Sequence, residues 1–237
     1  VRGRSAQGGA AAAPVMHEAF RRWVIEDSFC NGRPLWEDVG ATLTSDVHAY
    51  EAMKLRILNG GHQLLANAGE LLSVETIAGC MQDPDISAFF ERVQIREILP
   101  YVQSVPGIST DDYLALVQRR FANPKIHDTT RLVAFDGSSR HPGFLLPSLN
   151  DGLANGTAIE GLALAGALWA RMCAGTREDG SDIAANDPLW ADLNTVALAA
   201  RNAPEAWLQQ KGLYAETAHA PAFQTAFVRW LRAVWED

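Results

Sequence analysis

The stretch YEAMKLRILNGGHQLL, from Tyr50 to Leu65, predicts an amphipathic helix. Apolar residues recur in it at helical intervals, and Ser45-Asp46 upstream is typical of a helix start. The Gly60-Gly61 pair lowers helix stability by about 1 kcal/mol per glycine relative to alanine, so we expect a kink there, or close approach by a ligand or a neighbouring helix. The side chains expected to face the core are Leu55, Leu58, Leu64 and Leu65.

Three polar residues of this helix form a candidate catalytic group. At about 100° per residue, with Lys54 at 0°, His62 lies at about 80° and Asn59 at about 140°. A partly desolvated lysine can act as a base, an asparagine amide can donate to an oxyanion, and a histidine can orient a hydroxyl. This set suits alcohol oxidation or carbonyl reduction without a metal. The alternative is a solvated helix face, but His62 overlaps the apolar stripe, which predicts a partly buried imidazole that needs a partner.

The rest of the chain also has mainly helical patterns, which predict one all-α domain over residues 14–237. The small-residue tract at 1–13 resembles a linker, so we expect the chain to be part of a longer protein. Non-helical segments are expected at 33–47, as a loop or at most a short strand, at 123–149, as turns with one turn of helix, and at 175–188. Helices are expected at 17–29, 73–82, 83–102, 109–121 and 156–174, with three short helices closing the chain.

Composition and missing motifs exclude several function classes. The net charge is −8, the pI is near 5.2, and no Lys/Arg run exceeds two residues, which argues against a nucleic-acid or anionic-lipid surface. The odd number and wide spacing of Cys30, Cys80 and Cys173 predict reduced, buried thiols in a cytoplasmic protein. No apolar stretch is long enough to cross a bilayer. A glycine-rich nucleotide loop is absent and the histidines are scattered, so we expect no metal site.

Several longer motifs carry a family resemblance. They are W-V-I-E-D-x-F (Trp23 to Phe29), R-P-x-W-E (Arg33 to Glu37), D-V-x-x-Y-E-x-x-K-L-R-x-L-N-x-x-H (Asp46 to His62), R-F-x-N-P-x-I-x-D-T-x-R (Arg120 to Arg131) and D-G-S (Asp136 to Ser138). Together they resemble the C-terminal half of the mannitol dehydrogenase family, the polyol-specific long-chain dehydrogenases/reductases. The resemblance implies a multi-helical substrate-binding domain like those of mannitol dehydrogenase and 6-phosphogluconate dehydrogenase. It also implies an N-terminal Rossmann domain, expected to be absent from this chain, that binds NAD or NADP.

The resemblance assigns roles to residues of the quoted helix. Lys54 matches the family's general base, and Asn59 matches one of two asparagines that stabilise the developing oxyanion. His62 matches a ligand of a substrate hydroxyl that also helps to fix the lysine, and Glu51 matches a glutamate beside a proton-exit path. The alternative for Glu51 is an exposed acid near Arg56. Because a second domain covers the substrate side in this family, the surroundings of Lys54 are expected to face solvent here.

Two arginines complete the predicted substrate site. Arg131 resembles the start of a basic substrate-binding element, in which many members have a second arginine where this chain has Leu132. Arg140 occupies a position where relatives carry Lys or Arg, and is expected near a distal hydroxyl or carboxylate. The structural alternatives are that Arg131 pairs with Asp128 in the same helix and that Arg140 covers a loop.

The functional expectation is therefore one half of an NAD(P)-dependent, metal-independent oxidoreductase. It would interconvert a polyol or sugar acid and its keto form, as in mannitol and fructose, with a Rossmann domain of the same protein as its partner. Alternatives are a fructuronate or tagaturonate reductase of the same family, and a non-catalytic helical binding module. The chain alone is expected to be inactive, because the hydride carrier and half of the oxyanion site belong to the other domain. The choice of substrate and of NAD or NADP is left open.

Overall fold

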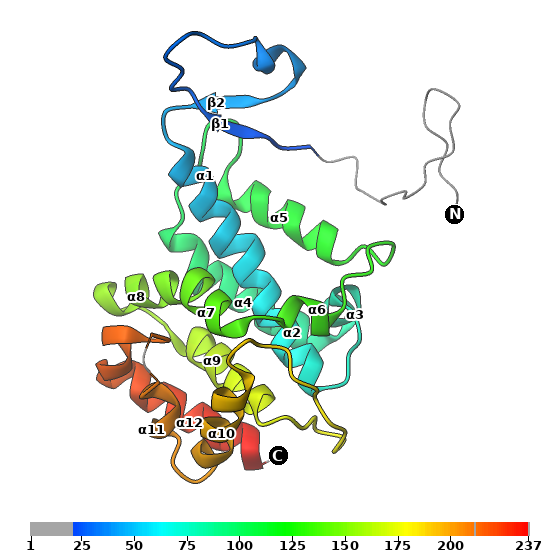
Figure 1. Ribbon diagram of the computed structural model, residues 1–237, viewed down its shortest axis with the longest axis vertical. Coiled ribbons are helices and arrows are strands. Elements are labelled where there is room, and N and C mark those ends of the chain that lie inside the picture. The colour runs from blue at the N-terminus through cyan, green and yellow to red at the C-terminus, as the bar shows by residue number, and fades with distance from the viewer. Residues whose placement is uncertain (1–20, 211, 237) are drawn as a thin grey trace. The chain divides into compact units, whose positions relative to one another are not determined.

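The computed structural model describes residues 21–210 and 212–236 and confirms an all-α fold (Figure 1). Its α-helices are α1 (Val47–Met53), α2 (Gly60–Leu71), α3 (Ile77–Gln82), α4 (Pro84–Val93), α5 (Thr110–Phe121), α6 (Thr130–Ala134), α7 (Gly137–Phe144), α8 (Leu146–Asn155), α9 (Glu160–Cys173), α10 (Trp190–Ala200), α11 (Glu205–Leu208) and α12 (Pro221–Glu236). The remaining elements are strands β1 (Val24–Glu26) and β2 (Thr42–Thr44), 3₁₀ segments η1 (Trp36–Val39), η4 (Leu99–Tyr101) and η5 (Ala215–His219), and π-helical segments η2 (Lys54–Asn59) and η3 (Gln94–Ile98).

The chain divides into two compact units, Val1–Val47 and His48–Asp237. This division falls inside the predicted 14–237 domain. The predicted boundary between a tail at 1–13 and that domain lies outside the described residues, so it stays a prediction. No helix in the described part of the chain is long and apolar enough to cross a membrane.

The first unit contains a small parallel sheet, and here the predicted helix at 17–29 is wrong. Val24–Glu26 forms β1, which pairs with β2 in the register Val24 to Thr42, whereas residues before 21 lie outside the described part. The β-branched pair Val24-Ile25 suits a half-buried strand, and a three-residue strand is too short for its period to show in the sequence. The expected short strand within 33–47 is confirmed by Thr42–Thr44.

The second unit is organised around one long helix formed by α1, η2 and α2 (Figure 1). The predicted helix through Tyr50–Leu65 is thus confirmed and continues to Leu71, with contacts to α3, α4, α6, α7 and α9. The expected close approach at the glycine pair is also found. A Cβ on Gly61 would lie 2.8 Å from both Gln94 Nε2 and Phe90 Cε2, so only glycine fits against the neighbouring helix.

The core face of the long helix differs from the predicted one before Gly60. Met53 and Ile57 are buried at 1% and 0% exposure, whereas Leu55 and Leu58 are only half-buried. The α-helical angle of 100° per residue placed the leucines inward, but residues 54–59 are wound as a π-helix and follow a different period. Leu64 and Leu65, which lie in the α-helical part, are buried as predicted.

Local capping rules explain most of the other helix starts. Asp83 caps α4, since its side chain accepts hydrogen bonds from the backbone N–H groups of Asp85 and Ile86, and Ser109 caps α5 by accepting from the N–H of Asp112. Helix α3 starts later than the expected residue 73: its cap is Thr76, and Ser73 has a positive φ of 59°. The segment 123–149, expected to hold one turn of helix, forms α6, α7 and part of α8. Helix α9 starts later than the predicted residue 156 and packs against α12, which is longer than expected.

Candidate active site

The π-helical winding of η2 sets the direction of the candidate catalytic side chains. In a π-helix the backbone N–H bonds to the carbonyl five residues earlier, and Gly60 N–H donates to Leu55 O in this way. Lys54 and Asn59 are five residues apart, so one turn separates them and they lie on the same side. The predicted angle of 140° between them is wrong, because it assumed α-helical winding. His62 follows Asn59 by three residues in α2, a spacing that also keeps the same side.

Lys54 and Asn59 are accessible on this face. Lys54 is exposed, as expected, and Asn59 is half-buried. Within residues 21–210 and 212–236, neither the ammonium of Lys54 nor the amide of Asn59 has a hydrogen-bond or ion-pair partner. An amine that can carry or release a proton therefore lies beside an amide that can donate to an oxygen.

His62 is half-buried. Its ring stacks on Phe121 with the centroids 4.2 Å apart, which fixes its plane. Nε2 is buried and has no hydrogen-bond partner among the described residues. Burial, with the charges of Arg120 and Arg140, lowers the pKa of His62 to about 4. The imidazole is therefore neutral at neutral pH, and a substrate hydroxyl could satisfy the free nitrogen.

Arg140 lies close enough to His62 for its charge to lower the pKa of the imidazole. Its Nη1 donates to Val133 O at 2.6 Å, and Gln63 Nε2 donates to the same oxygen at 3.0 Å. This contact orients the half-buried guanidinium from the end of α6. The structure therefore brings Arg140 to the His62 side of the site, and its predicted contact with substrate stays a prediction.

Arg131 takes part in a different set of contacts. Its Nη1 and Nη2 donate to Ala184 O and Ala185 O, each at 2.9 Å, so it fixes the 175–188 loop and does not pair with Asp128. Arg131 lines a pocket of about 420 Å³ together with Glu70 and Arg177. Lys54, Asn59 and His62 do not line this pocket, and the substrate role of Arg131 stays a prediction.

Glu51 lies one turn before Lys54 on an exposed surface. Its carboxylate is 3.5 Å from Nδ1 of His48. Glu51 is an exposed acid, as its structural alternative expects, but it does not pair with Arg56, which donates through Nη1 to Asp151 Oδ2 at 2.5 Å and to Tyr101 O at 3.1 Å. Glu51 is thus open to solvent, as a proton-exchanging group must be, and that role stays a prediction.

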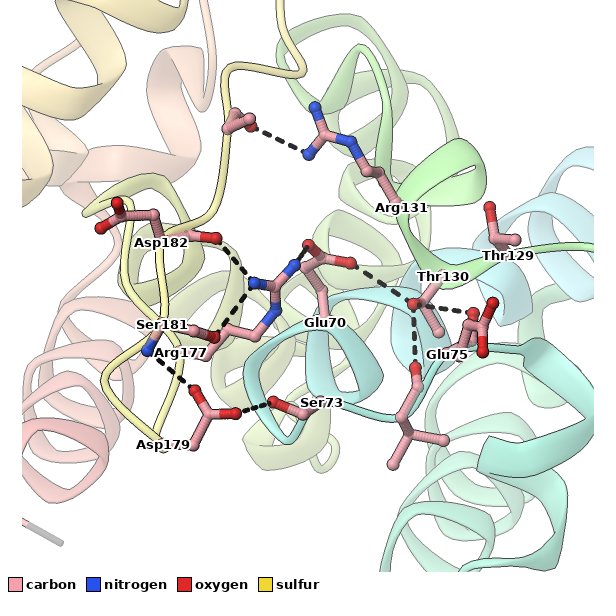
Figure 2. A network of polar contacts seen from close by, with 12 residues as sticks. Glu70, Ser73, Glu75, Thr129, Thr130, Arg131, Arg177, Asp179, Ser181 and Asp182 are labelled. Atoms are coloured by element: carbon pink, nitrogen blue, oxygen red, sulfur yellow. Dashed lines mark hydrogen bonds and ion pairs between the residues drawn. The ribbon is translucent and has the colours of Figure 1, made fainter.

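Sequence reasoning did not find the polar network at the end of α2 (Figure 2). Glu70, only 3% exposed, bonds Arg177 Nη2 at 2.7 Å, and Arg177 Nη1 donates to Asp182 O at 2.6 Å. Asp179 accepts from Ser73 at 2.7 Å in the same loop. The only sequence signal was a glutamate in an apolar helical run. The network attaches the loop after α9 to the helix that carries the candidate catalytic residues.

The described residues contain no group of three or more His, Cys, Asp or Glu side chains that could hold a metal ion. Cys80 and Cys173 are buried, and burial raises the pKa of both thiols, which suits unreactive core residues. Cys30 is exposed, so the expectation of burial is wrong for that residue.

The model of the mannitol dehydrogenase C-terminal domain family matches residues 46–235. The chain belongs to this family. It is 47% identical over 230 residues to mannitol 2-dehydrogenase of Cereibacter sphaeroides, covering 97% of this chain and 48% of that protein. It is 37% identical over 201 residues to D-mannonate oxidoreductase of Escherichia coli, covering 84% and 41%. The chain spans about half the length of the curated relatives it matches.

A solved relative has the same fold. Mannitol 2-dehydrogenase of Pseudomonas fluorescens, in a ternary complex with NAD and D-mannitol, superposes with a TM-score of 0.82. The two chains are 34% identical, and the match covers 92% of this chain and 44% of the other. The family-model match begins at residue 46, beside the division between the two compact units after Val47.

Proposed function

We propose that this chain supplies the substrate side of an NAD- or NADP-linked oxidoreductase that interconverts a polyol or sugar acid and its keto form. The observation that carries the proposal is the π-wound alignment of Lys54 and Asn59, two side chains without partners among the described residues, beside the unpaired Nε2 of His62. The relatives named mannitol 2-dehydrogenase and D-mannonate oxidoreductase support the class of substrate.

In the oxidation direction, the amine of Lys54 accepts the hydroxyl proton while the C–H hydrogen leaves the same carbon as hydride and the C=O bond forms. Bound NAD or NADP supplies the hydride acceptor. The amide of Asn59 donates to the oxygen as it gains negative charge, and His62 holds a neighbouring hydroxyl through Nε2. Exposed Glu51 then relays the proton from Lys54 to water. In the reduction direction Lys54, now protonated, returns the proton to the oxygen.

The residues of this chain fit a substrate rather than the cofactor itself. The candidate face offers an amine, an amide and an imidazole, and the sequence has no glycine-rich dinucleotide loop. We therefore propose that an N-terminal Rossmann domain of the same protein holds the cofactor and is the partner of this chain. The isolated chain is then expected to lack dehydrogenase activity. A cytoplasmic location is part of the same proposal and suits a cofactor-linked enzyme with reduced cysteines.

A second candidate within the class is a hexonate reductase acting on fructuronate or tagaturonate. It is favoured by the two guanidinium groups, Arg120 and Arg140, whose charges reach His62, because a substrate carboxylate near them would be stabilised. The choice between the two candidates can be measured as the ratio of kcat/KM for fructuronate to that for fructose.

The test is an activity screen of the protein encoded by the native gene. Initial rates are measured with NADH and NADPH on fructose, xylulose, fructuronate and tagaturonate, and with the oxidised cofactors on mannitol, arabinitol and sorbitol. The proposal expects turnover of at least one substrate without added metal and without loss on treatment with a chelator. Complete inactivity of a folded protein on all of them would leave the alternative of a helical binding module. Turnover by residues 1–237 alone would contradict the proposal that a separate Rossmann domain holds the cofactor.

A further inference from the structure

The π-helical segment that aligns the candidate catalytic residues is held from outside by one buried side chain. Gln94 begins η3, immediately after α4, and is completely buried. Its Nε2 donates to Ile57 O at 2.8 Å. Ile57 lies between Lys54 and Asn59, so the bond reaches the backbone within the turn that separates them.

The burial of Gln94 is otherwise unfavourable. Its Oε1 has no hydrogen-bond partner among the described residues, and an unpaired buried amide oxygen costs roughly 1–3 kcal/mol. An apolar side chain of similar length would avoid this cost. Among the described residues, the side chain of Gln94 makes one hydrogen bond, to Ile57 O, and an apolar replacement could not reproduce it.

Gly61 permits this contact. A Cβ there would lie 2.8 Å from Gln94 Nε2, so any larger residue would push the amide away from the helix. The glycine that weakens the helix intrinsically is therefore the one that lets the neighbouring side chain reach its backbone.

The segment that carries Gln94 is itself anchored. Glu97, in the same π-helical segment, accepts hydrogen bonds from Gly161 N and Leu162 N, each at 2.8 Å, at the start of α9. These bonds fix η3 against α9, so the amide of Gln94 is presented from a rigid neighbour. Arg56, in the π-helical segment η2, makes a second contact with residues outside the long helix by donating hydrogen bonds to Tyr101 O and to Asp151.

A π-helical turn is rare, and it occurs mostly where a side chain or a functional requirement stabilises it. With α-helical winding, Lys54 and Asn59 would be separated by about 140° around the axis. We propose that Gln94 is a positioning residue that holds Lys54–Asn59 in its π-helical register and thereby aligns the base with the oxyanion donor. The inference rests on the proposed function for its catalytic consequence, but the register itself is independent of it.

The test replaces Gln94 by methionine, which keeps the length and removes the donor, in the protein encoded by the native gene. The matched control is Gln224→Met, since Gln224 Nε2 also donates to a backbone carbonyl, Ala218 O at 2.7 Å, but lies in α12. Crystal structures of the substrate-free parent and variants show whether residues 54–59 keep the π-helical turn. Steady-state kinetics measure kcat and KM. We expect Gln94→Met to lose the π-helical turn and to have a kcat at least 10-fold lower than the parent, with KM within about threefold. Gln224→Met should keep the π-helical turn and the kcat of the parent.

Two results would overturn the inference: a π-helical turn that persists in Gln94→Met, or a turn that is lost without a fall in kcat. If Gln94→Met does not fold, Gln94→Glu serves instead, because a carboxylic acid donates to Ile57 O only when protonated. Its kcat is then expected to fall above an ionisation that the parent protein lacks, and a profile identical to that of the parent would also overturn the inference. Absence of turnover in the parent defeats the proposed function alone, since the register is read separately.

Discussion

Two histidines, the buried His141 and the half-buried His62, make the folded chain sensitive to acid. His141 is 5% exposed and stacks on Trp169 with the ring centroids 4.3 Å apart. Asn67 Nδ2 lies 2.7 Å from His141 Nε2, and since an amide N–H can only donate, this nitrogen must accept and the ring must be neutral. Burial lowers the pKa of His141 to about 3, and that of His62 is lowered to about 4.

The sign and size of the effect follow from proton linkage. In the unfolded chain each imidazole binds a proton near pH 6.5, whereas the folded chain excludes it until the pH approaches the lowered pKa. Stability is therefore fully present above about pH 6.5 and is lost as the pH falls. Between pH 8 and pH 5, each of the two histidines removes about 2 kcal/mol from the free energy of unfolding.

Urea unfolding of the 237-residue chain, followed by tryptophan fluorescence at pH 8 and pH 5, measures this loss. His141→Gln should lower stability at both pH values but reduce the difference between them by about 2 kcal/mol. His127→Gln is the control, because His127 is exposed, and it should leave the difference unchanged. Equal pH dependence in the parent and in His141→Gln would refute the reasoning.

Three further changes test the packing around the site by urea unfolding. The carboxylate of Asp83 caps α4 by accepting from two backbone N–H groups at 3.0 Å, so Asp83→Ala should lower the free energy of unfolding by about 1 kcal/mol. Arg177→Met leaves the carboxylate of Glu70 buried and unpaired and should cost roughly 3 kcal/mol, most of which Glu70→Gln in the same chain should restore. Gly69→Ala would put a Cβ 2.7 Å from Thr130 Cγ2 and closer still to Cys80 Sγ, so it should cost at least 1 kcal/mol. An unchanged midpoint in any of the three would contradict the contact concerned.

Local sequence rules accounted for the parts of the fold that depend on neighbouring residues. The cap at Asp83, followed by Pro84, and the cap at Ser109 were predictable because their hydrogen bonds close within one helical turn. The strand at Val24–Glu26 was not, because its pairing with Thr42–Thr44 depends on residues beyond its own three-residue segment.

The candidate site shows the same limit more sharply. Lys54, Asn59 and His62 could be selected from the sequence, but the π-helical winding between Lys54 and Asn59 could not, because the contact of Gln94 with Ile57 O joins residues 37 positions apart. Arg131 likewise donates to the carbonyls of Ala184 and Ala185, which lie far from it in the sequence, so no local pattern around Arg131 predicts these bonds.

The central claim is that Lys54 is the base of an oxidoreductase site. The most direct test compares Lys54→Met with Lys125→Met, an exposed lysine outside the site, in the protein encoded by the native gene and with the best substrate of the screen. We expect Lys54→Met to lower kcat roughly 100-fold to 10,000-fold at neutral pH, and Lys125→Met to leave it unchanged. A Lys54→Met protein whose kcat stays within about twofold of the parent would contradict the assignment of Lys54 as the base.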